Sequence, residues 1–210
     1  MRKNYGIRLF ILLLLTAFLS NTNAQSFERG AIVISAGTNL GIYNINFKTK
    51  TSAGKDTTTT SSTAALIYPV SVEVGLFNRL GLAAQFGYSK FIVSDSSKEA
   101  ANGIDVVLKA NFHIIKMDRI DVFVGADFGY AHFKYSSNDQ SSVSETANGS
   151  DLDFTLGARF YLTKHFGIYV NLDIPDYNYK GVLSSDNSNS LDFSGKFTGV
   201  KLGGGLQLKF

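Results

Sequence analysis

Few residues in this chain have the types and spacing that catalysis requires. There are three histidines, His113, His132 and His165. His132 precedes Ser136 and Ser137, so it could act as a general base beside a hydroxyl nucleophile. A histidine without a catalytic role is the simpler interpretation, and we expect no catalytic residue.

A pair of carboxylates is the best candidate for metal binding. Asp151 and Asp153 flank Leu152, and residues two apart in an extended segment share a face. The two carboxylates could bind a divalent cation, but neutralising nearby lysine and arginine side chains is the simpler role. The chain has no cysteine, which excludes disulfides and thiolate metal sites. We therefore expect no metal and no cofactor.

The segments that must hold these side chains have the period of two residues that is typical of β-strands. Even-numbered residues in them are almost all apolar and never charged, whereas odd-numbered residues are glycine, small, polar or charged. This pattern predicts eight strands, at 32–42, 66–76, 80–88, 104–114, 120–130, 152–162, 166–174 and 198–210.

The N-terminus has the features of a secretory signal peptide in the usual order. A basic start precedes the apolar run 9–19, which is too short to span a membrane as a helix. Small residues at 22–24 predict cleavage after Ala24. The sequence thus predicts a signal peptide at 1–24 and a single domain at 25–210.

The basic character of the full chain belongs to this N-terminal segment. Removing Arg2, Lys3 and Arg8 leaves as many lysines and arginines as the 17 aspartates and glutamates. A formally neutral mature chain without a basic stripe gives no support to nucleic-acid binding.

The connections between the predicted strands alternate strictly between short and long. Short links suit antiparallel hairpins, and long links rich in serine, threonine, asparagine and glycine suit solvated loops. An up-and-down meander of this kind can pair its first and last strands, which closes a barrel. The short links are 77–79, 116–119 and 163–165, and the long ones are 48–62, 94–102, 135–149 and 176–194.

The size of the side chains predicts which face of this barrel points outward. The interior of an eight-stranded barrel holds only enough side chains to fill it. The bulky even face would overfill that space, whereas the small odd face fits. An apolar exterior is what hydrocarbon requires, and aromatic residues near both ends of the even face, such as Tyr68, Tyr130 and Phe160, resemble membrane girdles. We expect a transmembrane barrel rather than a soluble one.

The odd positions then place charged residues in the lumen. A dry, unpaired charge there would be very costly, so we expect an ion-pair network that fills the barrel. A narrow conduit for ions or protons is the alternative. The predicted lumenal polar network is Glu73, Asp105, Lys109, Asp121, Asp127, Asp153, Arg159, Asp173 and Lys201.

In these respects residues 31–210 resemble the small eight-stranded outer-membrane proteins, similar in layout to OmpX and to the barrel half of OmpA. The resemblance implies that an alternating C-terminal strand ending in an aromatic residue directs insertion by the barrel-assembly machinery. Barrel enzymes that deacylate lipid A place a serine two residues after their histidine, whereas here Lys134 follows His132. The residues of the implied assembly signal are Val200, Leu202, Leu206, Leu208 and Phe210.

The layout is shared by proteins of different activity, so several functions remain open. We expect an integral outer-membrane protein with a filled polar lumen, in contact with outer-membrane lipid, whose short turns are periplasmic and whose long loops are extracellular. Its expected role is non-enzymatic, structural, adhesive or in surface interaction, and is exercised through the extracellular loops. An accessory barrel of a secretion or assembly system, similar to the PorT-like barrels and docked to an envelope protein partner, is the alternative. A lipid A modifying enzyme and a narrow channel rank lower.

Overall fold

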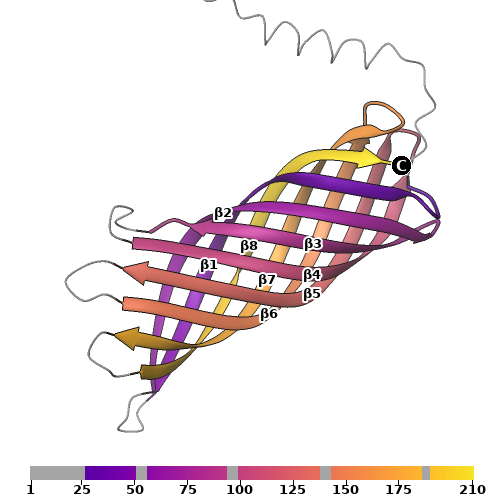
Figure 1. Ribbon diagram of the computed structural model, residues 1–210. Helices are drawn as coiled ribbons and strands as arrows, with labels where there is room; N and C mark the ends of the chain where they lie inside the picture. The colour runs from indigo at the N-terminus through magenta and orange to yellow at the C-terminus, as the bar shows by residue number, and fades with distance from the viewer. Residues whose placement is uncertain (1–26, 51–55, 94–98, 138–142, 186–189) are drawn as a thin grey trace, which may run out of the picture.

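The computed structural model describes residues 27–50, 56–93, 99–137, 143–185 and 190–210 (Figure 1). The predicted signal peptide and its cleavage site after Ala24 lie outside the described residues. No helix in these ranges is long and apolar enough to cross a membrane.

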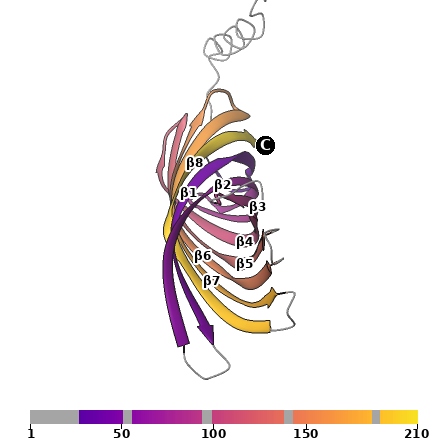
Figure 2. The same ribbon diagram turned by 90° about the vertical axis from the view of Figure 1, so that its left-hand side faces the viewer.

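The described residues form a closed barrel of eight antiparallel strands in sequence order (Figure 1). Strands β1 and β8 pair from Val33–Lys209 to Thr49–Phe193, so the sheet has no free edge between them (Figure 2). This confirms the predicted all-β, up-and-down barrel. The strands are β1 (Ile32–Lys50), β2 (Asp56–Phe77), β3 (Leu80–Phe91), β4 (Glu99–Lys116), β5 (Ile120–Ser137), β6 (Val143–Tyr161), β7 (Phe166–Ser185) and β8 (Ser190–Lys209).

The alternation of exposure confirms the predicted faces. Leu108 on β4 is 63% exposed, and the next residue, Lys109, is 8% exposed. Large apolar side chains at even positions on all eight strands point away from the barrel in the same manner. They form a continuous apolar band around the outside, which matches the hydrocarbon core of a bilayer.

The strands are much longer than predicted, and the long solvated loops were wrongly assigned. β2 begins at Asp56, β5 runs to Ser137 and β7 to Ser185, so most of the predicted long links are strand. The β1–β2 ladder, for example, continues to the pair Lys50–Asp56. Threonine, serine and asparagine predict loops by composition, but here they belong to paired strands, as Thr57 to Ser62 do on β2.

A short lead-in segment closes the end of the barrel where the termini lie. Gly30 N donates a hydrogen bond to Gly75 O at 2.8 Å, and Gly75 N donates to Ala31 O at 2.8 Å. A Cβ at Gly75 would collide with the backbone oxygen of Glu28, so this close approach requires glycine. The lead-in thereby brings Phe27, which is fully buried, into the barrel interior.

Candidate functional site

The barrel interior near the termini contains a compact group of charged side chains. His113 lies between two carboxylates, with Nδ1 2.7 Å from Asp121 Oδ1 and Nε2 3.1 Å from Glu73 Oε1. Arg159 donates from Nη2 to Glu73 and lies with Nη1 3.4 Å from Asp121 Oδ2. We call Glu73, His113, Asp121 and Arg159 the charged quartet.

The quartet is packed as well as paired. Phe27 stacks on the His113 ring with centroids 3.6 Å apart, and the Arg159 guanidinium lies 4.5 Å from the Phe123 ring centroid. Imidazole donates through both ring nitrogens only as imidazolium. In that form the quartet carries two positive and two negative charges, so its members compensate each other without water.

A second polar layer lies in the middle of the barrel. Lys109 Nζ is 3.2 Å from Asp127 Oδ2 and donates to Thr155 Oγ1, also at 3.2 Å. Thr155 in turn donates to Asp173 Oδ1 at 2.7 Å. These contacts link β4 through β7 across the lumen.

Lys201 on β8 completes this middle layer. Its ammonium donates to Asp153 Oδ2 and lies 3.3 Å from the Tyr177 hydroxyl oxygen. Asp105 is buried in the barrel interior, but the contacts of the described residues give it no ion pair. All nine residues of the predicted lumenal network are buried in the barrel interior. Eight lie in the two groups, and Asp105 makes no ion pair with the residues that the structure describes.

Little open space remains between the two groups. A cavity of about 40 Å³ lies there, and its lining includes Asn39, Glu73, Lys109 and Arg159. A water molecule occupies about 30 Å³ in the liquid, so this cavity has room for very few waters.

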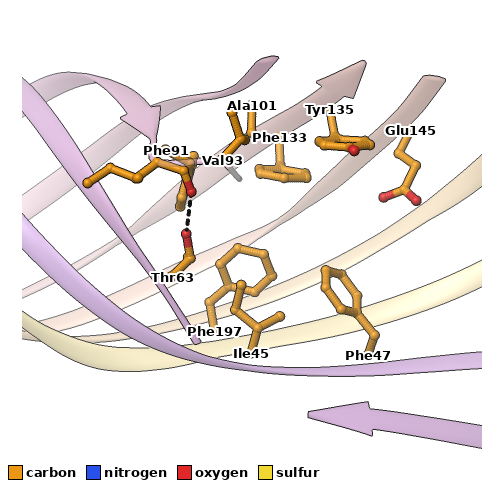
Figure 3. A pocket seen from close by; sticks show the side chains of 11 residues that line it. Ile45, Phe47, Thr63, Phe91, Val93, Ala101, Phe133, Tyr135, Glu145 and Phe197 are labelled. Atoms are coloured by element: carbon orange, nitrogen blue, oxygen red, sulfur yellow. Dashed lines mark hydrogen bonds between the residues drawn. The ribbon is translucent and has the colours of Figure 1, made fainter. Parts of the chain in front are cut away.

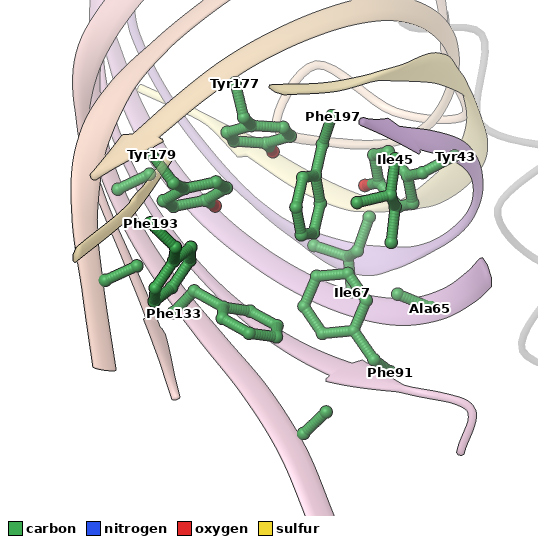
Figure 4. Close-up of a cluster of buried hydrophobic side chains, with 13 residues drawn as sticks. Tyr43, Ile45, Ala65, Ile67, Phe91, Phe133, Tyr177, Tyr179, Phe193 and Phe197 are labelled. Atoms are coloured by element: carbon green, nitrogen blue, oxygen red, sulfur yellow. The ribbon is translucent and has the colours of Figure 1, made fainter. Parts of the chain in front are cut away.

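The other half of the interior is apolar, and this half was not predicted. A cluster of buried side chains, drawn from all eight strands, lines the barrel interior at the end opposite the C-terminus (Figure 4). Many are aromatic, and several rings meet edge to face, as at Phe91 and Phe133 with centroids 5.3 Å apart. We call this part of the interior the outer chamber, and its residues are Tyr43, Ile45, Ala65, Ile67, Phe91, Ala101, Ala131, Phe133, Ala147, Tyr177, Tyr179, Phe193 and Phe197.

The outside of the wall around the outer chamber is polar. Ser62 Oγ donates to Asn44 Oδ1 at 3.1 Å, and Thr60 Oγ1 donates to Asn46 Oδ1 at 2.9 Å. Around the outer chamber the inner face of the wall is thus apolar and the outer face polar, whereas in the apolar band the outer face is apolar and the inner face polar. A wall that is apolar inside and polar outside belongs in water, so the strands extend beyond the lipid.

The sequence carried a signal for the outer chamber that the strand prediction missed. Within 43–48, tyrosine, isoleucine and phenylalanine alternate with two asparagines and a lysine, still with a period of two. The apolar residues have changed from even to odd numbers, because the side of the wall that faces water has changed. A search for alternation in either parity would have extended β1 to its end.

The candidate catalytic and metal residues do not gather into a site. His132 is half-buried, and its Nδ1 lies 2.7 Å from Asn148 Oδ1, which also accepts from the Tyr130 hydroxyl at 2.5 Å. Asp153 pairs with Lys201, as described. Among the residues that the structure describes, no group of histidines and carboxylates could hold a metal ion.

The closed barrel with its lipid-facing band defines an integral outer-membrane β-barrel. The model of the outer membrane protein beta-barrel domain family matches residues 10–210, and the chain belongs to this family. It is therefore a protein of the outer membrane.

Two solved structures have the same fold. OprG from Pseudomonas aeruginosa superposes with a TM-score of 0.68 at 12% identity, over 88% of this chain and 98% of that chain. The outer membrane protein AlkL, determined by solid-state NMR in DMPC bilayers, gives a TM-score of 0.53 at 13% identity, over 88% and 92%. No curated protein matches the sequence. At such identities the likeness concerns the fold alone.

Proposed function

We propose that this protein is a sealed, non-enzymatic outer-membrane barrel that acts at the cell surface through the part of its wall beyond the lipid. The observation that carries the proposal is the division of the interior, with buried ion pairs at membrane depth and a separate chamber above them. Ion pairs of this kind fill the cross-section, so the lumen offers no continuous water path. The pairing of His132 with Asn148, rather than with a serine, supports a role without catalysis.

A sealed lumen predicts that the purified protein does not conduct. In planar lipid bilayers we expect no discrete current steps, because in the described structure the charged quartet and the middle layer are separated by a cavity of about 40 Å³, which is too small for an aqueous channel. A porin recorded in the same chamber supplies the positive control. Reproducible step currents that scale with the amount of this protein would overturn the sealed barrel.

The protruding wall predicts a pattern of chemical labelling on intact cells. Thr60→Cys, on the polar outer face of β2, should react with a membrane-impermeant maleimide from outside. Asp118→Cys, in the exposed turn between β4 and β5, should react only after the envelope is permeabilised. The chain has no cysteine of its own, so there is no background. Equal labelling of both positions on intact cells would contradict the proposal that the outer chamber faces the outside of the cell and the short turns face the periplasm.

We also propose that β8 carries the assembly signal. Val200, Leu202, Leu206, Leu208 and Phe210 are all exposed on the outer face. In an assembled barrel this row contacts lipid, and before insertion it is an apolar stripe that the assembly machinery could recognise.

A further inference from the structure

The outer chamber is not completely filled. A cavity of about 330 Å³ opens within it, between two walls of the barrel. Phe133 and Tyr135 on β5 form one wall, and Ile45, Phe47 and Phe197 on β1 and β8 face them across the space (Figure 3). Ligand pockets of proteins have volumes from about 300 Å³ upward and walls that are mostly apolar.

The cavity results from small residues opposite large ones and from a short strand. Ala101, on β4, lines it where the other walls carry rings. Strand β3 has 12 residues, while its neighbours β2 and β4 have 22 and 18. The β2–β3 ladder ends at Ala65–Phe91, beyond which Thr63 Oγ1 donates to Ile92 O at 3.2 Å. Beyond the end of β3 the cavity is lined by Thr63, Ile92 and Val93.

None of the side chains that the structure describes occupies this aromatic cavity beyond the membrane. Exposed apolar surface of this kind is unfavourable in water, and where it persists it commonly marks a binding site. The segments that connect the strands at this end, 51–55, 94–98, 138–142 and 186–189, contain no aromatic and no branched aliphatic residue. Their sequences therefore offer no large apolar side chain to occupy the cavity.

One carboxylate limits which molecules fit. Glu145 on β6 is the single charged residue among those that line the cavity in the described structure, and Figure 3 shows its side chain beside Tyr135. Burial raises the pKa of Glu145, as expected for a carboxylate beside apolar groups. At a pH above this raised pKa the carboxylate is ionised, so it repels anions and accepts hydrogen bonds from neutral donors.

We propose that the outer chamber binds a small, uncharged, largely apolar molecule, aromatic or with a short acyl chain, whose polar end donates a hydrogen bond to Glu145. At about 30 Å³ for each heavy atom, as for liquid water, 330 Å³ holds a molecule of about ten heavy atoms. This inference deepens the proposed surface function and rests on the wall extending beyond the lipid.

The proposal is tested by NMR titration of the protein in lipid nanodiscs with labelled alanine methyl groups. The probes are 2-naphthol, which is neutral, and 2-naphthoate, which is an anion. The methyl groups of Ala101, Ala131 and Ala147 report from the chamber. We expect saturable shifts at these methyl groups with naphthol and much weaker binding of naphthoate. Shifts that never saturate, or that spread over lipid-facing alanines alone, would indicate partition into lipid and overturn the proposal.

Two substitutions on the same strand provide the matched comparison. Ala101→Phe should fill the cavity and weaken naphthol binding by about tenfold or more, whereas Ala110→Phe, on the lipid-facing side of β4, should leave it unchanged. Glu145→Gln should reduce the difference in binding affinity between naphthol and naphthoate. If Ala101→Phe and Ala110→Phe bind naphthol equally, the cavity is not the site.

The surface function and the ligand can fail separately. If the barrel does not bind naphthol but shows the expected labelling at Thr60→Cys, the ligand proposal is wrong and the proposed surface function still stands. Absence of that labelling would remove the surface function, whatever the titration shows.

Discussion

Arg159→Met is expected to destabilise the folded barrel by about 3–5 kcal/mol, the usual cost of removing one partner from a buried ion pair. Arg159 contacts both Glu73 and Asp121. Without it, two buried carboxylates are left with His113 alone, in a part of the barrel that the lipid surrounds. Equilibrium unfolding by urea in detergent micelles measures the loss, with heat-modifiable migration on gels as the sign of the folded state.

Two controls separate charge from packing in this prediction. Glu73→Gln combined with Arg159→Met removes a charge of each sign, so the double variant should be more stable than Arg159→Met alone. Arg79→Met removes an exposed arginine in the turn between β2 and β3 and should change stability by less than about 0.5 kcal/mol. If Arg159→Met and Arg79→Met unfold at the same urea concentration, the charged quartet does not stabilise the barrel.

Leu108→Arg is expected to destabilise the inserted barrel by about 2–4 kcal/mol, because it places a charge near the bilayer midplane. Leu108 lies between Ile104 and Ile114, near the middle of the outward-facing row on β4. Its side chain is 63% exposed on the outer face of the barrel. The measurement is the amount of folded protein in outer-membrane fractions, together with unfolding in lipid vesicles.

The control for this charge lies on the same strand and the same face. Ala100 points outward like Leu108 but lies beyond the apolar band, two residues farther from it than Asn102. Ala100→Arg should therefore be nearly neutral. Equal losses for the two variants would mean that the band does not mark the position of the lipid.

The closed barrel and its faces were predictable from the sequence because water and lipid differ so strongly as solvents. Each lipid-facing residue from Ile104 to Ile114 must be uncharged, and the strict alternation that results is stronger than any local propensity. The same alternation places the nine lumenal polar residues at odd positions, and all nine are buried in the barrel interior.

The outer chamber was not predicted, because the residues there have a composition typical of loops, and this obscures the alternation that indicates strands. Residues 57–62 contain only threonine and serine, which suit loops and the wet face of a strand equally well. The position of Phe27 on His113 was beyond prediction for a different reason. It depends on how a short lead-in enters the barrel end, and no periodic pattern records such a contact.

Along single strands the outward-facing residues change from apolar to polar, and the position of this change determines how deep the molecule sits in its membrane. On β1 the outward row turns from Ile42 to Asn44 within one step, and on β4 from Ile104 to Asn102. A rise of about 3.3 Å per residue makes each such step about 7 Å along the strand. If the barrel sank by one step, Asn44 and Asn102 would enter the hydrocarbon, and if it rose by one step, Ile42 and Ile104 would be exposed to water. The boundary between apolar and polar residues on the outer face therefore fixes how deeply the barrel is inserted. It holds the outer chamber at a constant height above the lipid.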